Sequence, residues 1–423
     1  MNEQLLNCFL AAVVVVFAGS DAPTRFAELR KKVEEARESK DQKRLLAAEI
    51  EVAEFFHDSA PATEQLALTF SEIGDQVRAL QAVHDFVAMG QADDNLPAAR
   101  PFAAWKDQPE FKELMHQMDL NKTPIYQADP LVEFKDPGLI PEDIDYDPST
   151  EPFLVTSVLG KKIVRISLDG RESDFAKSPE GWPMLAIKID RIRGLLWATE
   201  VALDKFAAAP SKDWGRSMIL CLDLKNRTIV REVEGPAESA LGDMALTPDG
   251  DVLVADNNGG GLYRLRSKAG SKLERIDGGD FLSPQPPVVL PRGSLVFVPD
   301  YERGVALLDT ATKQARWIDG RKLHTLHGVD GLYLQNGSLL AIQNGSAPER
   351  VVRFRLDPEF REVTAEEVIE RSTPTLGDPT HGVIVGDRFY YIANSGWDSL
   401  DGTGKLKQNA TMTRARIMRS KFH

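Results

Sequence analysis

Alternating apolar runs joined by tight-turn residues recur along the chain from residue 139 onward. Residues 332–334 and 339–342 are two such runs, and Asn336-Gly337 stands between them. Two apolar runs joined by Asn-Gly are typical of a β-hairpin, because a tight primed turn needs positive φ at both central residues. Residues 247–256, TPDGDVLVAD, repeat this phrase with Asp-Gly in the turn. A phrase that returns at a domain-scale period predicts a repeat architecture.

Six phrases of this kind follow one another at a spacing of about fifty residues. Their opening residues are Pro141, Pro183, Gly242, Pro284, Asp330 and His381. Each phrase holds about four short strands, and radial repetition of four-stranded sheets produces a propeller. A pair of packed sandwiches would have similar strand content, but its units would not restart on the same phrase. The sequence therefore predicts a mainly β fold, a six-bladed β-propeller over residues 139–423.

Residues 24–120 follow a different pattern and predict a small α-helical region. Apolar side chains recur there at helical spacing, for example at Phe26, Leu29 and Val33. Residues 62–90 resemble a tetratricopeptide-type helix pair, with a Gly-Asp turn between two amphipathic helices. Stacked helix pairs often bind segments of other proteins, so a protein partner through this region is one expectation. The alternative is a helical cap packed on the main domain, because such arrays generally need three repeats.

Two segments are predicted to lie outside both folded regions. Residues 121–138 contain Pro124, Pro130 and Pro137 without clear periodicity, which predicts a linker. Residues 1–20 are typical of a secretory signal peptide, since an apolar run too short to span a bilayer precedes small residues at a cleavage site. This signal lacks the usual Lys or Arg near its start. We expect export to the periplasm or the exterior and a mature protein without a membrane segment.

Composition restricts the classes of partner. Hydrophobic residues make up 42% and charged residues 27% of the 423 positions, which is ordinary for a soluble globular protein. The formal net charge of −13 argues against a nucleic-acid partner, because phosphate binding needs clustered Lys and Arg. The two cysteines, Cys8 and Cys221, cannot form a disulfide framework.

The residues that open the six phrases are the candidate site. In a propeller the innermost strand of each blade lines the central channel, so these residues are expected to converge. They include Glu142, Asp143, Asp243, Gln285, Asp330 and His381. Converging carboxylates repel one another unless a cation lies among them or some are protonated. Oxygen ligands without cysteine favour a hard cation, Ca²⁺ above Mg²⁺, and disfavour structural zinc. Strand capping would explain any one of these acids, whereas a metal better explains the group.

Three of these phrases carry a resemblance to a known family. They are residues 141–148 (PEDIDYDP), the triplet Val329-Asp330-Gly331 with its hairpin, and residues 242–250 (GDMALTPDG). Together they resemble the six-bladed propellers of the senescence marker protein/gluconolactonase family and of the related paraoxonases. The resemblance covers roughly two thirds of the chain, from residue 139 to about 400.

The resemblance implies a set of metal ligands. Glu142, Gln285 and Asp330 would hold a catalytic cation, and Asp143 and Asp243 would hold a second, structural calcium. The chain departs from the family at two positions, because members usually have Asn where Gln285 and Gly242 stand. A glutamine still offers an amide oxygen, but a glycine offers no side chain at all.

Two functions of different class follow. The resemblance implies a secreted, calcium-dependent hydrolase of a lactone or related ester, in which the cation polarises the carbonyl and Asp330 acts as general base. His381 is an alternative base, since neutral imidazole has a suitable pKa. The second function is a non-catalytic propeller that binds a protein or a small ligand, with the helical region forming part of its surface.

Overall fold

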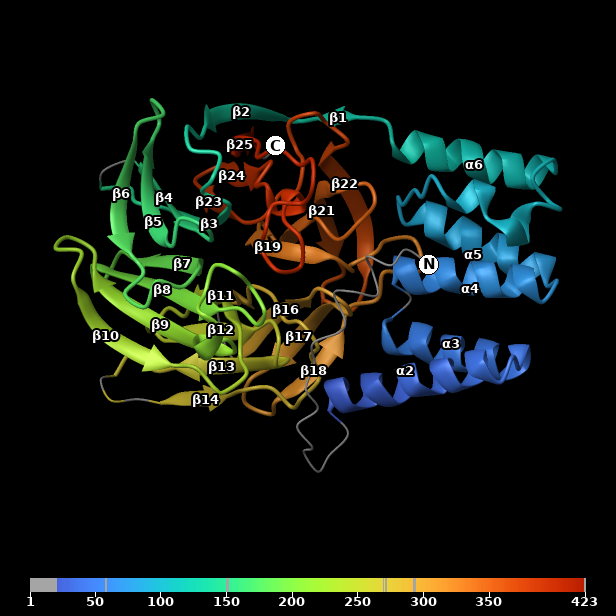
Figure 1. The fold of residues 1–423 in the computed structure, drawn as a ribbon, viewed down its shortest axis with the longest axis horizontal. Coiled ribbons are helices and arrows are strands. Elements are labelled where there is room, and N and C mark those ends of the chain that lie inside the picture. Colours follow the sequence, from blue (N-terminus) through green and yellow to red (C-terminus); the bar gives the residue numbers. More distant parts are fainter. Residues whose placement is uncertain are drawn as a thin grey trace.

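The chain forms a ring of six antiparallel sheets with a layer of helices along one side (Figure 1). This computed structural model describes residues 21–57, 59–149, 152–268, 270, 272–291 and 294–421. The predicted fold class, a six-bladed β-propeller preceded by a small helical region, is confirmed. The predicted signal peptide, residues 1–20, lies outside the described residues.

Each sheet is one blade of consecutive, hydrogen-bonded strands. Blade 1 holds β3 (Pro141–Tyr146), β4 (Pro152–Ser157), β5 (Lys162–Ser167) and β6 (Glu172–Lys177). Blade 2 holds β7 (Met184–Asp190), β8 (Leu195–Ala202), β9 (Arg216–Asp223) and β10 (Ile229–Glu234). Blade 3 holds β11 (Leu241–Leu246), β12 (Val252–Asp256), β13 (Gly261–Leu265) and β14 (Leu273–Arg275).

The remaining blades follow the same order. Blade 4 holds β15 (Val288–Val289), β16 (Leu295–Asp300), β17 (Gly304–Asp309) and β18 (Gln314–Trp317). Blade 5 holds β19 (Val329–Gln335), β20 (Ser338–Gln343), β21 (Arg350–Leu356) and β22 (Val363–Arg371). Blade 6 takes β23 (Gly382–Val385), β24 (Arg388–Ala393) and β25 (Arg416–Lys421) from the end of the chain.

Turn chemistry explains why the strands pair where they do. Gln335 pairs with Ser338, so Asn336 and Gly337 form a two-residue loop with φ of 50° and 75°. Positive φ at both central positions is what a type I′ hairpin requires. Apolar cores then fill the spaces between neighbouring blades all the way round the ring. Because each sheet is buried on both faces, its central strands are almost continuously apolar.

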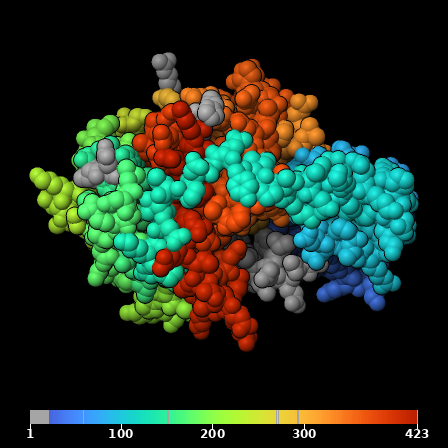
Figure 2. All heavy atoms as spheres, turned by 90° about the horizontal axis from the view of Figure 1, so that it is seen from above, coloured from blue at the N-terminus to red at the C-terminus, as the bar shows by residue number. Residues whose placement is uncertain are grey.

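The predicted linker, residues 121–138, is where the structure differs from the expectation. β2 (Ala128–Glu133) pairs with β25 and becomes the outermost strand of blade 6. β1 (Ile125–Tyr126) adds a fifth strand to blade 5. Figure 2 shows this segment, in cyan, running from the helices across the last blades. An edge strand is half exposed and tolerates Pro130, so no alternating pattern announces it.

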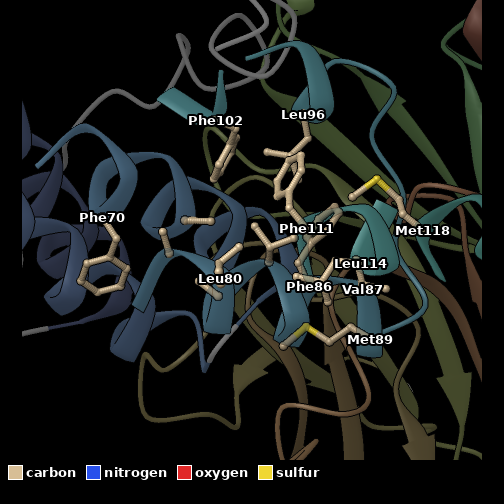
Figure 3. Packing of buried hydrophobic residues seen from close by; sticks show 14 of the residues in the cluster. Phe70, Leu80, Phe86, Val87, Met89, Leu96, Phe102, Phe111, Leu114 and Met118 are labelled. Atoms are coloured by element: carbon tan, nitrogen blue, oxygen red, sulfur yellow. The ribbon is translucent and has the colours of Figure 1, made fainter. Parts of the chain in front are cut away.

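The helical region consists of five α-helices within the described residues. They are α2 (Ala22–Glu38), α3 (Gln42–Phe55), α4 (Ala60–Glu72), α5 (Gln76–Ala88) and α6 (Pro109–Asn121), with short 3₁₀ turns at Leu96–Ala98 and Arg100–Phe102. Side chains of Asp21, Asp41, Ser59 and Asp75 cap the first four helices. Phe70, Phe86 and Phe111 belong to the core between α4, α5 and α6 (Figure 3). None of the described helices is long and apolar enough to cross a membrane.

The helical region is packed against the propeller along blades 4 and 5. The Arg303 guanidinium lies over the Phe55 ring at 4.1 Å and donates to the Phe55 carbonyl oxygen at 3.1 Å. Further along, Ala92 N donates to the Ala347 carbonyl oxygen at 2.6 Å. Gly90 lies directly against the buried Arg350 side chain. These contacts agree with a helical cap docked on the main domain and leave a protein partner as a prediction.

Candidate metal centre

The innermost strands carry the irregularities that form the site. Around most of the ring the first strands of neighbouring blades contact one another, which places them around the central channel. Their pairing with the second strand shifts register between Pro141 and Ile144 in blade 1, between Leu241 and Asp243 in blade 3, and between Val329 and Gly331 in blade 5. A β-bulge inserts an extra residue and re-aims the side chains beside it. The predicted acids therefore stand at bulges.

Three of the predicted residues come together at the end of the channel where these strands begin. One ligand atom each from Glu142, Asp330 and His381 lies within 4.8 Å of the others. They belong to blades 1, 5 and 6, so only closure of the ring brings them together. His381 also lies beside blade 3, with Nε2 2.8 Å from Asp243 Oδ1, an ion-pair distance. Its Nδ1 is 3.1 Å from the Glu142 carbonyl oxygen.

Asparagine side chains hold two of the acids in place by the same device. Asn344 Nδ2 donates to Asp330 Oδ2 at 2.9 Å and to the Pro379 carbonyl oxygen at 3.0 Å. Asn257 Nδ2 donates to Asp243 Oδ2 at 2.8 Å and to the Pro284 carbonyl oxygen at 2.8 Å. In both blades the asparagine follows the second strand, 14 residues after the acid. Each amide thus joins an acid of one blade to the next blade.

Steric crowding explains why position 242 holds a glycine. A Cβ atom at Gly242 would lie 1.7 Å from Asn257 Oδ1, far inside van der Waals contact. The Asn257 side chain therefore occupies the space that a larger residue at 242 would need. Position 242 therefore lacks the expected asparagine, but the side-chain amide of Asn257 contacts the adjacent Asp243 instead.

The two other predicted ligands have different surroundings. Asp143 is buried, and its Oδ2 accepts from Ile187 N at 2.9 Å and from Lys188 Nζ at 2.6 Å. Gln285, also buried, lies ahead of β15 and its Nε2 donates to the Ser283 carbonyl oxygen and hydroxyl at 3.2 and 3.3 Å. Neither belongs to the group of Glu142, Asp330 and His381 described above.

The site is electrostatically strained when only protein atoms are present. Burial, and next the charge of Asp330, raise the pKa of Glu142 to about 8. Burial also raises the pKa of Asp330 to about 6, with Asp243 adding to the effect. For His381 burial acts to lower the pKa, but the carboxylates of Asp243 and Asp330 outweigh it and raise the pKa well above its ordinary value. Protons are thus retained where like charges converge.

One buried polar atom without a partner tests whether a cation fits here. Asn344 Oδ1 is buried and makes no hydrogen bond with the described residues, whereas the buried Asp243 Oδ1 and His381 Nε2 face each other at ion-pair distance. An atom such as Asn344 Oδ1 is costly to bury unless something satisfies it. Two carboxylates and an imidazole are ordinary ligands of a divalent cation, so the residues present fit one. The imidazole nitrogen shifts the donor set away from the oxygen-only set expected for Ca²⁺ and towards a transition metal.

Several contacts of the site are not predicted by the sequence. Trp397 Nε1 donates to the Glu142 carboxylate, although 255 positions separate them. The sequence around Asn257 and Asn344 indicates only a hairpin loop and a turn. Each asparagine follows a channel acid by 14 positions, and this equal spacing was the signal in the sequence that could have identified them. Nothing in the pattern around Lys188 indicates that it contacts Asp143.

The fold and the site together define a class, a six-bladed β-propeller with an acidic group at one end of its channel. No protein-family model matches the sequence, and no curated protein is significantly similar to it.

Among solved structures, the chain is similar to virginiamycin B lyase from Staphylococcus aureus, with 14% identity, a TM-score of 0.43, and coverage of 70% of this chain and 99% of the other. It is also similar to a luciferin-regenerating enzyme, with 13% identity, a TM-score of 0.47, and coverage of 71% and 95%. A gluconolactonase from Xanthomonas campestris has 12% identity, a TM-score of 0.46, and coverage of 71% and 97%.

Proposed function

We propose that this chain is a metal-dependent hydrolase that opens a lactone or a related ester at the end of its central channel. The observation that carries the proposal is the convergence of Glu142, Asp330 and His381 from three blades to within 4.8 Å. The buried Asn344 Oδ1, which makes no hydrogen bond with the described residues, supports a cation as the missing partner. Export, suggested by residues 1–20, and Ca²⁺ as the ion belong to the same proposal, with a transition metal as the alternative ion.

Glu142, Asp330 and His381 are the residues that would hold the cation. When bound there, a divalent cation would polarise the substrate carbonyl and stabilise negative charge on its oxygen. Asp330, with a pKa of about 6, is ionised at neutral pH and can accept the proton of the attacking water. Asn344 fixes Asp330 through Oδ2, and Trp397 fixes Glu142. The carboxylates beside His381 keep its imidazole protonated in the metal-free chain, which disfavours its alternative role as base.

The test combines metal binding with turnover. Chelator-stripped protein is titrated with Ca²⁺, Mn²⁺ and Zn²⁺ by calorimetry and then assayed on a panel of lactones and aryl esters. Asp330→Asn should lose the ion and at least about 100-fold of kcat/KM, as expected when a base and ligand is removed. Asp387→Asn is the matched control, because Asp387 is an exposed acid in the β23–β24 turn.

Two outcomes would contradict the proposal. If Asp330→Asn binds the ion and turns over substrate like the wild type, then Glu142, Asp330 and His381 do not form the metal centre. An ion bound by the wild type without hydrolysis of any lactone or ester would instead favour a non-catalytic propeller that binds a ligand.

A further inference from the structure

We propose that the ammonium group of Lys188 occupies the position beside Asp143 that a second metal ion would otherwise take. The channel then binds one divalent ion, at Glu142, Asp330 and His381. This inference rests on the proposed function for the ion itself, but it concerns a different pair of residues and a separate measurement.

The contact that carries the inference crosses from blade 2 to blade 1. Lys188 on β7 places Nζ 2.6 Å from Oδ2 of Asp143 on β3. The Asp143 side chain is 2% exposed and that of Lys188 is 22% exposed, so the pair is largely removed from water. An ion pair at this distance and depth is a fixed feature of the channel wall rather than a solvated surface contact.

The carboxylate of Asp143 is already satisfied by its protein partners. Its Oδ1 accepts from Ile144 N at 2.8 Å, and its Oδ2 accepts from Ile187 N at 2.9 Å as well as from the ammonium group. Both oxygens therefore point at donors of the chain. A metal ion could bind Oδ2 of Asp143 only by displacing Lys188.

The channel acids therefore divide into two groups with different partners. Asp143 faces Lys188. The neighbouring Asp145 has Arg191 Nη2 3.9 Å from its Oδ1 and accepts from Ile189 N and Tyr146 N, both at 2.7 Å, so each of these two acids has its own cation. In the other group, Glu142, Asp243 and Asp330 share one imidazole, that of His381. Three carboxylates against one imidazole leave an excess of negative charge only in the second group. That excess, together with the unpaired Asn344 Oδ1 beside Asp330, places the divalent ion there and not at Asp143.

The experiment counts ions in the full chain by calorimetry and equilibrium dialysis with Ca²⁺ and Mn²⁺. Lys188→Met removes the charge at similar length and leaves Asp143 unpaired in a buried position, which is the environment that takes up a cation. We expect this variant to bind one ion more than the wild type. The extra ion should vanish in the double variant Lys188→Met/Asp143→Asn. Lys188→Arg keeps the charge and should bind as many ions as the wild type.

Thermal melts cover the case in which Lys188→Met folds poorly. Added Ca²⁺ or Mn²⁺ should restore its Tm towards the wild-type value and should not restore the double variant. Equal ion counts in wild type and Lys188→Met, with no restoration, would overturn the inference. So would a wild-type ion that Asp143→Asn alone removes.

The two proposals fail separately. A wild type that binds no ion while Lys188→Met gains one would sink the proposed metal centre and keep the role of Lys188. One ion in the wild type and one in Lys188→Met would support the proposed metal centre and overturn the role of Lys188.

Discussion

Glu200 on β8 is a buried acid without a cationic partner among the residues that the structure describes. It is fully buried, and its Oε2 accepts from the Ser178 hydroxyl and from Glu180 N. Its Oε1 makes no hydrogen bond with the described residues. Burial raises the pKa of Glu200 from 4.5 to about 7. Unlike the channel acids, Glu200 has no group of converging ligands around it, so its buried charge is a cost to stability.

Replacing Glu200 should change how stability depends on pH. The folded state holds the Glu200 proton between pH 4.5 and about 7 and the unfolded state does not, so stability falls as pH rises through this window. Glu200→Gln removes the titration and should be more stable than wild type at pH 8 by on the order of 2 kcal/mol, with little difference at pH 5. Chemical denaturation across pH 5–8 measures this difference.

The control for this prediction is an exposed acid far from Glu200. The stability of Glu28→Gln on α2 should depend on pH as that of the wild type does, because Glu28 is in water in both states. If the free energy of unfolding of Glu200→Gln also follows that of the wild type across this pH range, then Glu200 is ionised at little cost in the folded protein.

At the scale of elements, the end of α5 decides how closely the helical region approaches the propeller. Gly90 follows this helix with φ of +77°. A Cβ atom there would lie 2.6 Å from Nη1 of Arg350 on β21. The Arg350 side chain is fully buried and is held by Gln343 Oε1 at 2.8 Å and Glu366 Oε1 at 2.9 Å, so it has little room to move. A glycine is therefore required both for the backbone and for the contact.

Gly90→Ala and Gly74→Ala form a matched pair that separates these two requirements. Both glycines have positive φ, +77° and +81°, but a Cβ at Gly74 would meet nothing within 4 Å. Gly74→Ala should cost about 1 kcal/mol for the backbone strain. Gly90→Ala should cost about 1–3 kcal/mol more, because the methyl group displaces the Arg350 guanidinium. Equal losses of Tm in the two variants would contradict this, because they would show that Arg350 moves aside for the methyl group at little cost in stability.

At the scale of the whole molecule, the propeller is closed by a strand from the start of its own domain. β2 completes blade 6, whose other strands come from the end of the chain. Val132 of β2 and the adjacent Phe134 are 6% and 0% exposed in the core between blades 6 and 1. Burying two such side chains contributes about 1.5–3 kcal/mol each, and each ladder hydrogen bond adds about 1 kcal/mol.

A pair of truncations tests this closure. A chain of residues 124–423 keeps β2, whereas a chain of residues 135–423 loses it, and both lack the helical region. The shorter chain should lose on the order of 5 kcal/mol, which is comparable with the stability of a whole domain. We expect it to be insoluble or to melt without cooperativity, while the longer chain melts cooperatively in calorimetry. Similar melts for both chains would mean that three strands suffice to close the ring.

Features that depend on neighbours along the chain could be predicted from local patterns. Period-two runs and the Asn336-Gly337 turn specify hairpins locally, because each turn type demands particular φ values. The return of one phrase six times determined the number of blades, since every blade must bury the faces of its neighbours. The placement of Glu142, Asp330 and His381 at the start of three phrases was enough to predict that they lie near one another.

Contacts between blades could not be predicted from local patterns, because they depend on how the ring closes. Trp397 meets Glu142, and Lys188 meets Asp143, because the ring closes at a particular radius and register. β2 joins blade 6 because the last blade lacks a partner for β25, and not because its own pattern is strand-like. Which carboxylates receive a protein cation and which are left for a metal is likewise set by distances across the channel. These distances have no counterpart in local sequence, since Coulomb interactions depend on separation in space.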